Sequence, residues 1–192
     1  MNLSKLAVFF SLNFIVIGIT VLIWPFFIIK NFPKAFKRGW LSWLTAFFML
    51  IIDQWTKIIA VQKISTYKPK VLIPDIFKLE ITKNKGAAFG IMENYQWLFI
   101  SVAFIAIIIF FLLSAKPVKQ MKLLYLGYGF LIGGALGNLI DRIRVDYVID
   151  FMHLNGFPVF NVADLSIDAG LLILFWYLLI GERRKKNASS IS

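Results

Sequence analysis

The sequence lacks cysteine altogether and has a single histidine, His153. The missing thiols exclude disulfides, thiolate metal sites and cysteine nucleophiles. A zinc site needs several His, Cys or carboxylate ligands at fixed spacings, and no such cluster is visible, so the sequence predicts no metal site. A lone histidine is most simply interpreted as a loop residue near a membrane interface.

Charge is also scarce, since only 16% of the 192 residues are charged and 59% are hydrophobic. A soluble domain usually carries about 25% charged residues. The excess of apolar residues indicates a membrane protein, and the length indicates one integral domain over residues 1–192. The net charge is +11, but the basic residues lie mostly between apolar segments and in the tail. Phospholipid headgroups are therefore expected as partners, and nucleic acid is not.

Five apolar segments are long enough to be helices in a bilayer, which needs about 20 residues per crossing. A cleavable signal peptide is the rival interpretation of the first, but its run is too long and no A-x-A cleavage site follows. We therefore expect an all-α membrane bundle with helices over residues 6–29, 40–62, 96–114, 121–140 and 164–180.

Basic residues predict the orientation of these helices. Short loops rich in Lys and Arg normally stay on the cytoplasmic side. Residues 30–38 and 116–122 and the tail at 182–192 are basic and fall on one side if there are five crossings. The N-terminus then lies outside, and the helix ends at the outer face are those near Gln62, Gln96, Ile140 and Asp164.

The segment from Lys63 to Tyr95 does not resemble a spanning helix. Residues 77–82 read FKLEIT, whose alternation of apolar and polar side chains is typical of a strand. Asn84-Lys85-Gly86 follows, and Asn and Gly favour a turn. We expect a small extramembrane sheet or hairpin on the outer face. Asn84 and Gly86 either form a plain turn or present backbone groups to an extended peptide by strand addition.

Two of the apolar helices contain polar residues at helical spacings. Asp53 and Lys57 are four residues apart, so they share a face and can pair. Gly133 and Gly137 form a small-xxx-small pattern that lets a neighbouring helix approach closely.

A second face of the fourth helix carries Asn138, Asp141 and Arg142. The structural interpretation is a buried brace with an Asp141–Arg142 contact, and a direct catalytic role for Asp141 is the alternative. An adjacent arginine keeps a carboxylate ionised, which suits an anchor better than a proton donor.

Asp150 and Asp164 have contrasting surroundings in the sequence. Asp150 lies between large apolar residues, where desolvation favours the protonated acid. If Asn161 is the N-cap of the last helix, Asp164 is the third residue inward, where backbone amides and the helix dipole favour the anion. Such a pair can divide acid and base roles, as in aspartic proteases. The structural alternative is a loop residue and a plain helix cap.

Taken together, these residues resemble the lipoprotein signal peptidase family, also called signal peptidase II. The resemblance covers about Trp40 to Gly181 and rests on five blocks in order: DQWTK at 53–57, NKGAAF at 84–89, GALGNLIDR at 134–142, VIDF at 148–151 and FNVAD at 160–164. Each block alone is weak, but the five in order at the outer ends of apolar helices are specific.

The resemblance implies a core of four spanning helices over residues 40–181 in the bacterial cytoplasmic membrane, preceded here by the extra helix at 6–29. It implies an aspartic endopeptidase that cuts prolipoproteins just before a diacylglyceryl-modified cysteine, without metal or organic cofactor. A monomer is expected, because a pair of acids within one chain needs no second copy. The implied catalytic pair is Asp150 and Asp164. The implied supporting residues are Asn138, Asp141, Arg142, Asn161, Asp53 and Lys57, and Asn84 and Gly86 are implied to contact substrate.

Two departures from the family pattern lie just after the second acid. Leu165 stands where many members have Ser, and Asp168, one turn after Asp164, either perturbs the pair or binds Lys57. Two other functions use the same residues: a proton-coupled transporter with a carboxylate relay, and a scaffold whose polar residues only lock the helices. A relay needs acids spread across the bilayer, whereas only Asp53 and Asp168 are expected deep in the membrane.

Overall fold

The computed structural model describes residues 37, 39–64, 68–86, 96–114 and 122–189. The predicted helix at 6–29 and two of the basic segments lie outside these residues, apart from Lys37 and Lys122. The elements in order are α3 (Trp40–Lys63), β1 (Lys70–Ile73), β2 (Phe77–Asn84), α4 (Gln96–Ser114), α5 (Lys122–Val145), β3 (Val148–Leu154) and α6 (Val162–Ser189).

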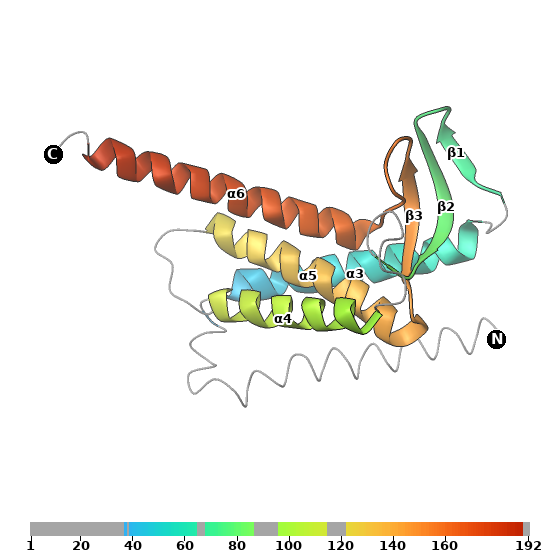
Figure 1. Cartoon of the computed structure of the whole chain (residues 1–192), viewed down its shortest axis with the longest axis horizontal. Helices are drawn as coiled ribbons and strands as arrows, with labels where there is room; N and C mark the ends of the chain where they lie inside the picture. The colour runs from blue at the N-terminus through green and yellow to red at the C-terminus, as the bar shows by residue number, and fades with distance from the viewer. Residues whose placement is uncertain (1–36, 38, 65–67, 87–95, 115–121, 190–192) are drawn as a thin grey trace.

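Helix α5 is the centre of the bundle and packs against α3, α4 and α6 (Figure 1). Its glycines permit this. A Cβ on Gly133 would lie 2.8 Å from the Ala46 carbonyl oxygen of α3, and one on Gly134 would lie 2.4 Å from the Ala163 carbonyl oxygen. These distances leave no room for a side chain, so the predicted close approach at Gly133 is confirmed.

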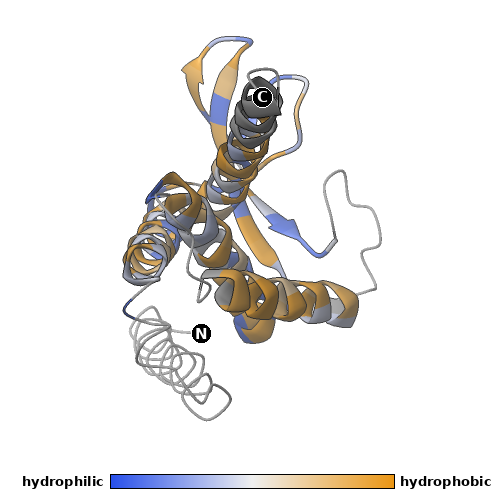
Figure 2. Cartoon of the chain, turned by 90° about the vertical axis from the view of Figure 1, so that its left-hand side faces the viewer, coloured by the Kyte–Doolittle hydropathy of each residue, from blue (hydrophilic) through white to orange (hydrophobic). Residues whose placement is uncertain are grey.

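The helices of the bundle have the length and hydropathy of membrane-spanning segments. Three helical segments are long and apolar enough to cross a membrane: α3, α5 and the Val162–Leu179 part of α6. The apolar part of α4, Trp97–Phe110, is shorter. Large apolar side chains are exposed along the helices, among them Phe47, Leu172 and Phe175. Hydrophobic residues dominate these helices (Figure 2). Together these features describe a multi-pass membrane protein.

The small sheet lies at one end of the bundle, where α3 and α5 end and α4 and α6 begin (Figure 1). It is antiparallel with the strand order β1-β2-β3. The expected sheet is therefore present, and the alternating segment at 77–82 lies within β2 as predicted.

The expected boundary between the fourth helix and the loop after it is wrong. Helix α5 continues past Ile140 to Val145, and the segment expected to be loop contains strand β3. The helix continues because its polar residues near Asp141 meet charged partners inside the bundle. Strand β3 forms because β2 supplies its backbone hydrogen bonds from a distant part of the chain.

Candidate active site

The start of α6 is held by a reciprocal cap. The Asp164 amide donates to Asn161 Oδ1 at 3.0 Å, and the Asn161 amide donates to Asp164 Oδ2 at 3.0 Å. Asn161 directly precedes α6 and Asp164 is its third residue, as predicted. This arrangement is a capping box with Asp in place of Glu, and it satisfies two amides that the helix itself leaves free.

The other oxygen of Asp164 is bound from α5. Asn138 Nδ2 donates to Asp164 Oδ1 at 2.8 Å. Both carboxylate oxygens therefore accept N–H hydrogen bonds, and the group lies in the first turn of a helix. Both features stabilise a carboxylate anion.

Asp150 lies in β3 and is only 1% exposed. Its Oδ1 accepts a hydrogen bond from Asn161 Nδ2 at 2.6 Å, and its Oδ2 accepts one from Asn84 Nδ2 at 2.9 Å. Burial, and next the negative charge of Asp164, raise the pKa of Asp150 from 3.8 to about 7, although both amides oppose this rise. The acid therefore changes protonation near neutral pH.

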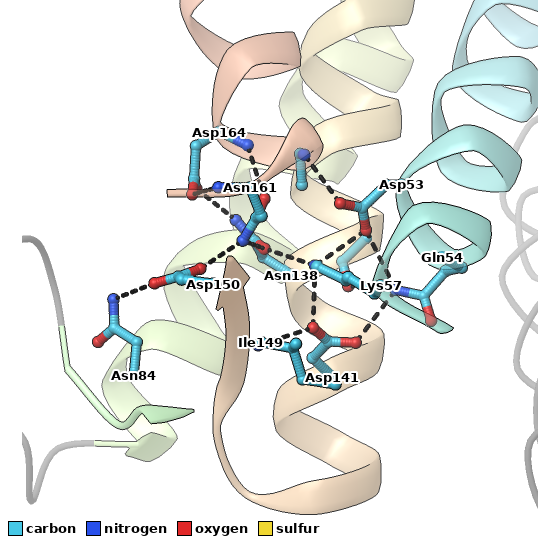
Figure 3. Close-up of polar contacts among 12 residues, drawn as sticks. Asp53, Gln54, Lys57, Asn84, Asn138, Asp141, Ile149, Asp150, Asn161 and Asp164 are labelled. Carbon is cyan, nitrogen blue, oxygen red and sulfur yellow. Dashed lines mark hydrogen bonds and ion pairs between the residues drawn. The ribbon is translucent and has the colours of Figure 1, made fainter. Parts of the chain in front are cut away.

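Asn161 brings the two aspartates together. Its side-chain amide binds Asp150 while its Oδ1 and backbone amide bind Asp164 (Figure 3). The two carboxyls, expected from the sequence to form a pair, thus share one neighbour at the end of the bundle. They come from different elements, a strand and a helix.

A buried charge cluster lies behind the pair. Lys57 Nζ lies 2.9 Å from both Asp53 Oδ2 and Asp141 Oδ2, and it donates to Asn138 Oδ1 at 3.1 Å. The predicted pairing of Asp53 with Lys57 is confirmed. Arg144 adds a second positive charge 3.4 Å from Asp141 Oδ1, so the cluster contains two anions and two cations. Such compensation is what makes buried charges tolerable.

The two acids of this cluster also hold the backbone beside the pair. Asp53 Oδ1 accepts a hydrogen bond from the Ala163 amide at 2.8 Å, which fixes the first turn of α6. Asp141 Oδ2 accepts one from the Ile149 amide at 3.2 Å, one residue before Asp150. The bracing interpretation of Asp141 therefore has a direct structural basis.

The arginine expected to contact Asp141 is the wrong one. Arg144, one turn along α5, makes that contact. Arg142 points elsewhere: its Nη2 donates to the Gly86 carbonyl oxygen at 3.3 Å, and its guanidinium lies 5.1 Å from the ring centre of Phe99. Residues three apart on a helix share a face, so the spacing of Asp141 and Arg144 could have predicted their contact. The prediction named Arg142 instead, because it is next to Asp141 in the sequence.

The turn after β2 uses the residues expected to bind substrate. The Gly86 amide donates to Asn84 Oδ1 at 2.9 Å, as in a turn closed by an Asn side chain. Asn84 also reaches Asp150, and Arg142 holds the Gly86 carbonyl. The Gly86 amide is therefore already engaged, so strand addition through it does not fit this structure.

Sequence reasoning also missed Gln54, a neutral residue that contacts the charge cluster. Gln54 Nε2 lies 3.1 Å from each of three acceptors: Asp53 Oδ2, Asp141 Oδ1 and the Gly137 carbonyl oxygen. Its position beside Asp53 in an apolar helix was the available signal, because a buried amide needs partners.

Two other polar candidates, His153 and Asp168, lie apart from the Asp150–Asp164 pair. His153 is in β3 rather than a loop, and its Nδ1 contacts Glu80. Asp168 is exposed on α6, whereas Lys57 is enclosed by other acids, so the expected alternative of an Asp168–Lys57 pair is wrong. Asp53, expected to lie deeper in the membrane than the pair, instead touches the first turn of α6.

The sequence of residues 45–180 matches the family model described as signal peptidase (SPase) II. The chain belongs to the signal peptidase II family. It is similar to the lipoprotein signal peptidases of Halothermothrix orenii, 37% identical over 73% of this chain and 97% of that one, and Moorella thermoacetica, 39% identical over 74% and 97%.

Solved structures agree with this membership of the signal peptidase II family. Two bacterial membrane enzymes match the fold, with TM-scores of 0.71 and 0.66 at 31% and 32% identity. The first match covers 75% of this chain and 90% of the other, and the second covers 72% and 92%. Membership of this family makes the chain a peptidase.

Proposed function

We propose that this chain is an aspartic endopeptidase that removes the signal peptide from diacylglyceryl-modified prolipoproteins, cutting just before the lipidated cysteine. Family membership supports the substrate class. The observation that carries the mechanism is the bridge made by Asn161, which binds the carboxyls of Asp150 and Asp164 at once. A water held between two such groups is the requirement for hydrolysis without a covalent intermediate.

In this proposal Asp150 is the acid and Asp164 is the base. The pKa of Asp150, raised to about 7 by burial and by the charge of Asp164, leaves much of it protonated at neutral pH. Asp164 keeps both oxygens in hydrogen bonds to N–H donors, which favour its anion. One carboxyl holds a proton while its neighbour can accept one.

The reaction then follows in two proton-balanced steps. Asp164 takes a proton from water as the water oxygen bonds to the scissile carbonyl carbon, and the Asp150 proton moves to the developing oxyanion. In collapse, Asp150 recovers that proton, the C–N bond breaks, and the proton on Asp164 passes to the leaving nitrogen. Positioned acid and base groups typically contribute roughly 10²–10⁴-fold each.

The other polar residues act as positioning residues in this proposal. Asn138 ties Asp164 to Lys57, while Asp53 and Asp141 fix the backbones of α6 and β3 beside the pair. Arg142 holds the turn at Gly86, which places Asn84 on Asp150. Substrate would then contact Asn84 and Gly86 at the surface of this turn, because the Gly86 amide already donates to Asn84 Oδ1.

We place the enzyme in the bacterial cytoplasmic membrane as a monomer, with residues 40–181 as the peptidase core and the site near the outer face. One chain supplies both acids, so a second copy is not needed. Asp141 near the end of α5, Asp150 in β3 and Asp164 at the start of α6 lie together, close to Asp53 (Figure 3). This grouping is unlike a relay across the bilayer. This observation favours the peptidase over the transporter.

The test uses Asp150→Asn and Asp164→Asn with Asp146→Asn as the control, because Asp146 is exposed at the turn before β3. The purified variants are incubated with a prolipoprotein that carries the diacylglyceryl group and with one that lacks it. We expect cleavage of the modified substrate by wild type and by the control only. Cleavage by either site variant at the wild-type rate would remove that residue from the mechanism.

A further inference from the structure

The sheet has two chemically different faces. Along β3, Asp150, Met152 and Leu154 point to one side and His153 points to the other, because side chains alternate in a strand. The Asp150 carboxyl is bound at the start of α6, so its side of the sheet is turned toward the helix bundle (Figure 3).

The pairing of the strands extends this bundle-side face. Met152 is paired with Leu79, and Leu154 is paired with Phe77. Phe77 is also paired with Ile73 of β1. Paired residues share a face, so Leu79, Phe77 and Ile73 continue this face as apolar side chains toward the end of the sheet.

The opposite face carries a cluster of charged and polar side chains, next to Val71, which is paired with Lys78. His153 is paired with Lys78, whose Nζ lies 2.9 Å from Glu80 Oε2, and His153 also contacts Glu80. Burial opposes ionisation of Glu80, but the ion pair with Lys78 and the hydrogen bond with His153 outweigh it and lower the pKa of Glu80. A sheet with one apolar and one charged face is amphipathic, so its two faces suit different surroundings.

The far end of the sheet exposes large apolar side chains. Asn155 joins the loop after β3 to the β1–β2 turn, because its backbone N–H donates to the Ile76 carbonyl oxygen at 2.9 Å. We call the exposed apolar residues of these two turns and of the end of β1 the sheet tip: Leu72, Ile73, Ile76 and Phe157, which are 46–61% exposed. Clustered exposed apolar residues of this size mark an interaction surface.

The sheet tip lies outside the footprint of the helices. In two views at right angles, the ends of the strands extend past α6 to the side of the bundle (Figures 1 and 2). The apolar face there is turned toward the side on which the helices run. These helices are long and apolar enough to cross a bilayer, so we place the lipid boundary beside α6, beneath the overhanging tip.

Positive charge accompanies this apolar surface. Lys68 and Lys70 are both exposed. Lys70 is paired with Leu79 and therefore lies on the bundle-side face. Lysines on such a face can bind the phosphate groups of anionic lipids while neighbouring apolar side chains enter the acyl boundary.

We propose that the sheet tip inserts into the interfacial layer of the bilayer, and that Lys68 and Lys70 bind the headgroups of anionic phospholipids there. This contact fixes the height of β3, and with it Asp150, relative to the lipid. The proposal depends on the membrane bundle and the amphipathic sheet, and it goes beyond the proposed peptidase reaction because it needs no substrate.

The cysteine-free chain allows a direct test with single cysteines. Ile76→Cys and Phe157→Cys place a fluorescent nitrobenzoxadiazole label on the sheet tip, and Lys78→Cys places the same label on the charged face as the matched control. Each labelled full chain is reconstituted without substrate in phosphatidylcholine vesicles, with or without phosphatidylglycerol. Lipids brominated near the headgroup or near the chain end serve as quenchers, and iodide is the aqueous quencher.

We expect blue-shifted emission at positions 76 and 157, with stronger quenching by shallow than by deep bromines. Interfacial segments usually enter about 5–10 Å below the surface, which is within reach of the shallow bromine only. The label at position 78 should instead respond to iodide. If the labels at 76 and 157 are quenched by lipid no more than the label at 78, the insertion is overturned, whatever the cleavage assay shows.

The charge component has its own test. Phosphatidylglycerol should strengthen bromolipid quenching at position 157, and Lys70→Gln should reduce that gain. Lys83→Gln is the control, because Lys83 is also exposed but lies on the opposite face of the sheet. It is paired with Ile149, whose side chain points away from that of Asp150. An unchanged gain in the Lys70 variant would overturn the binding of anionic headgroups.

Discussion

The replacement Asp150→Asn removes a charge with little change in shape, and its effect on stability should depend strongly on pH. Asp150 is 1% exposed, and its pKa is raised from 3.8 to about 7 by burial and by Asp164. The folded state therefore prefers the protonated acid. Its contribution to stability is fully present below about pH 4 and is lost as the pH rises through 7.

The size of this loss follows from the two pKa values. The difference between about 7 and 3.8 is about 3 units, and each unit corresponds to about 1.4 kcal/mol, so ionising Asp150 costs about 4 kcal/mol above pH 7. Asparagine avoids this cost, but it has one side-chain oxygen where Asp150 has two. It therefore loses the hydrogen bond from either Asn84 or Asn161. One unmade buried bond costs about 1–3 kcal/mol.

The variant should therefore be less stable than wild type at pH 4 and more stable at pH 8. At each end the difference is about 1–3 kcal/mol, or roughly 2–4 °C in apparent Tm per kcal/mol for a chain of this size. Tryptophan fluorescence during heating in detergent measures it. Asp146→Asn, exposed and four residues earlier, should show no trend. A wild-type–variant difference that stays constant from pH 4 to 8 would refute the titration of Asp150.

Four further outcomes are expected. Peptidase activity should fall as the pH rises above about 7, because Asp150 loses the proton that it donates in the proposed mechanism; a rate that keeps rising to pH 9 would contradict this role. Gly137→Ala should destabilise the fold by about 1–3 kcal/mol, because its Cβ would lie 2.4 Å from Asp53 Oδ2; a wild-type melting temperature would show that α3 can move aside. Lys57→Met should cost about 3–5 kcal/mol, because it leaves buried Asp53 without its cation and leaves Asp141 with Arg144 alone, and normal detergent stability would argue against the ionised cluster. Asp146→Val should cost about 1–2 kcal/mol because φ there is 64°, whereas Asp146→Asn should be neutral; equal unfolding midpoints for the two variants would exclude backbone strain.

The helices could be predicted wherever hydropathy alone decides them. The apolar run from Trp40 gave α3 to within one residue at its end, and α4 has the predicted bounds. The prediction failed at the end of α5, where Asp141, Arg142 and Arg144 read as the start of a loop. Their partners on other elements permit the helix to continue, and a single stretch of sequence does not contain those partners.

Strand β3 was missed for a related reason. Val148–Leu154 lacks the clean alternation of FKLEIT, because the beginning of the strand is buried on both sides. Its backbone partners are on β2, far away in sequence, so only the assembled sheet defines it. The position of Asp150 depends on that sheet.

The local part of the site was predictable, and its closure was not. Asn161 and Asp164 are three residues apart, so a cap between them follows from helix geometry alone. That Asn161 also reaches Asp150 depends on where β3 is docked, and Asp141 holds it there through the Ile149 amide. The residues of the charge cluster therefore determine the geometry of the pair.

This sharing of residues affects how mutants should be interpreted. A substitution in the charge cluster lowers activity and stability together, because it releases α6 or β3. Loss of cleavage alone then does not separate a catalytic group from a structural one. Asp150 is distinguishable because its buried side chain, with a pKa raised to about 7, destabilises the fold when it is ionised. Asp141 instead forms ion pairs with Lys57 and Arg144. Replacement by the neutral amide should therefore raise stability at pH 8 at Asp150 and lower it at Asp141.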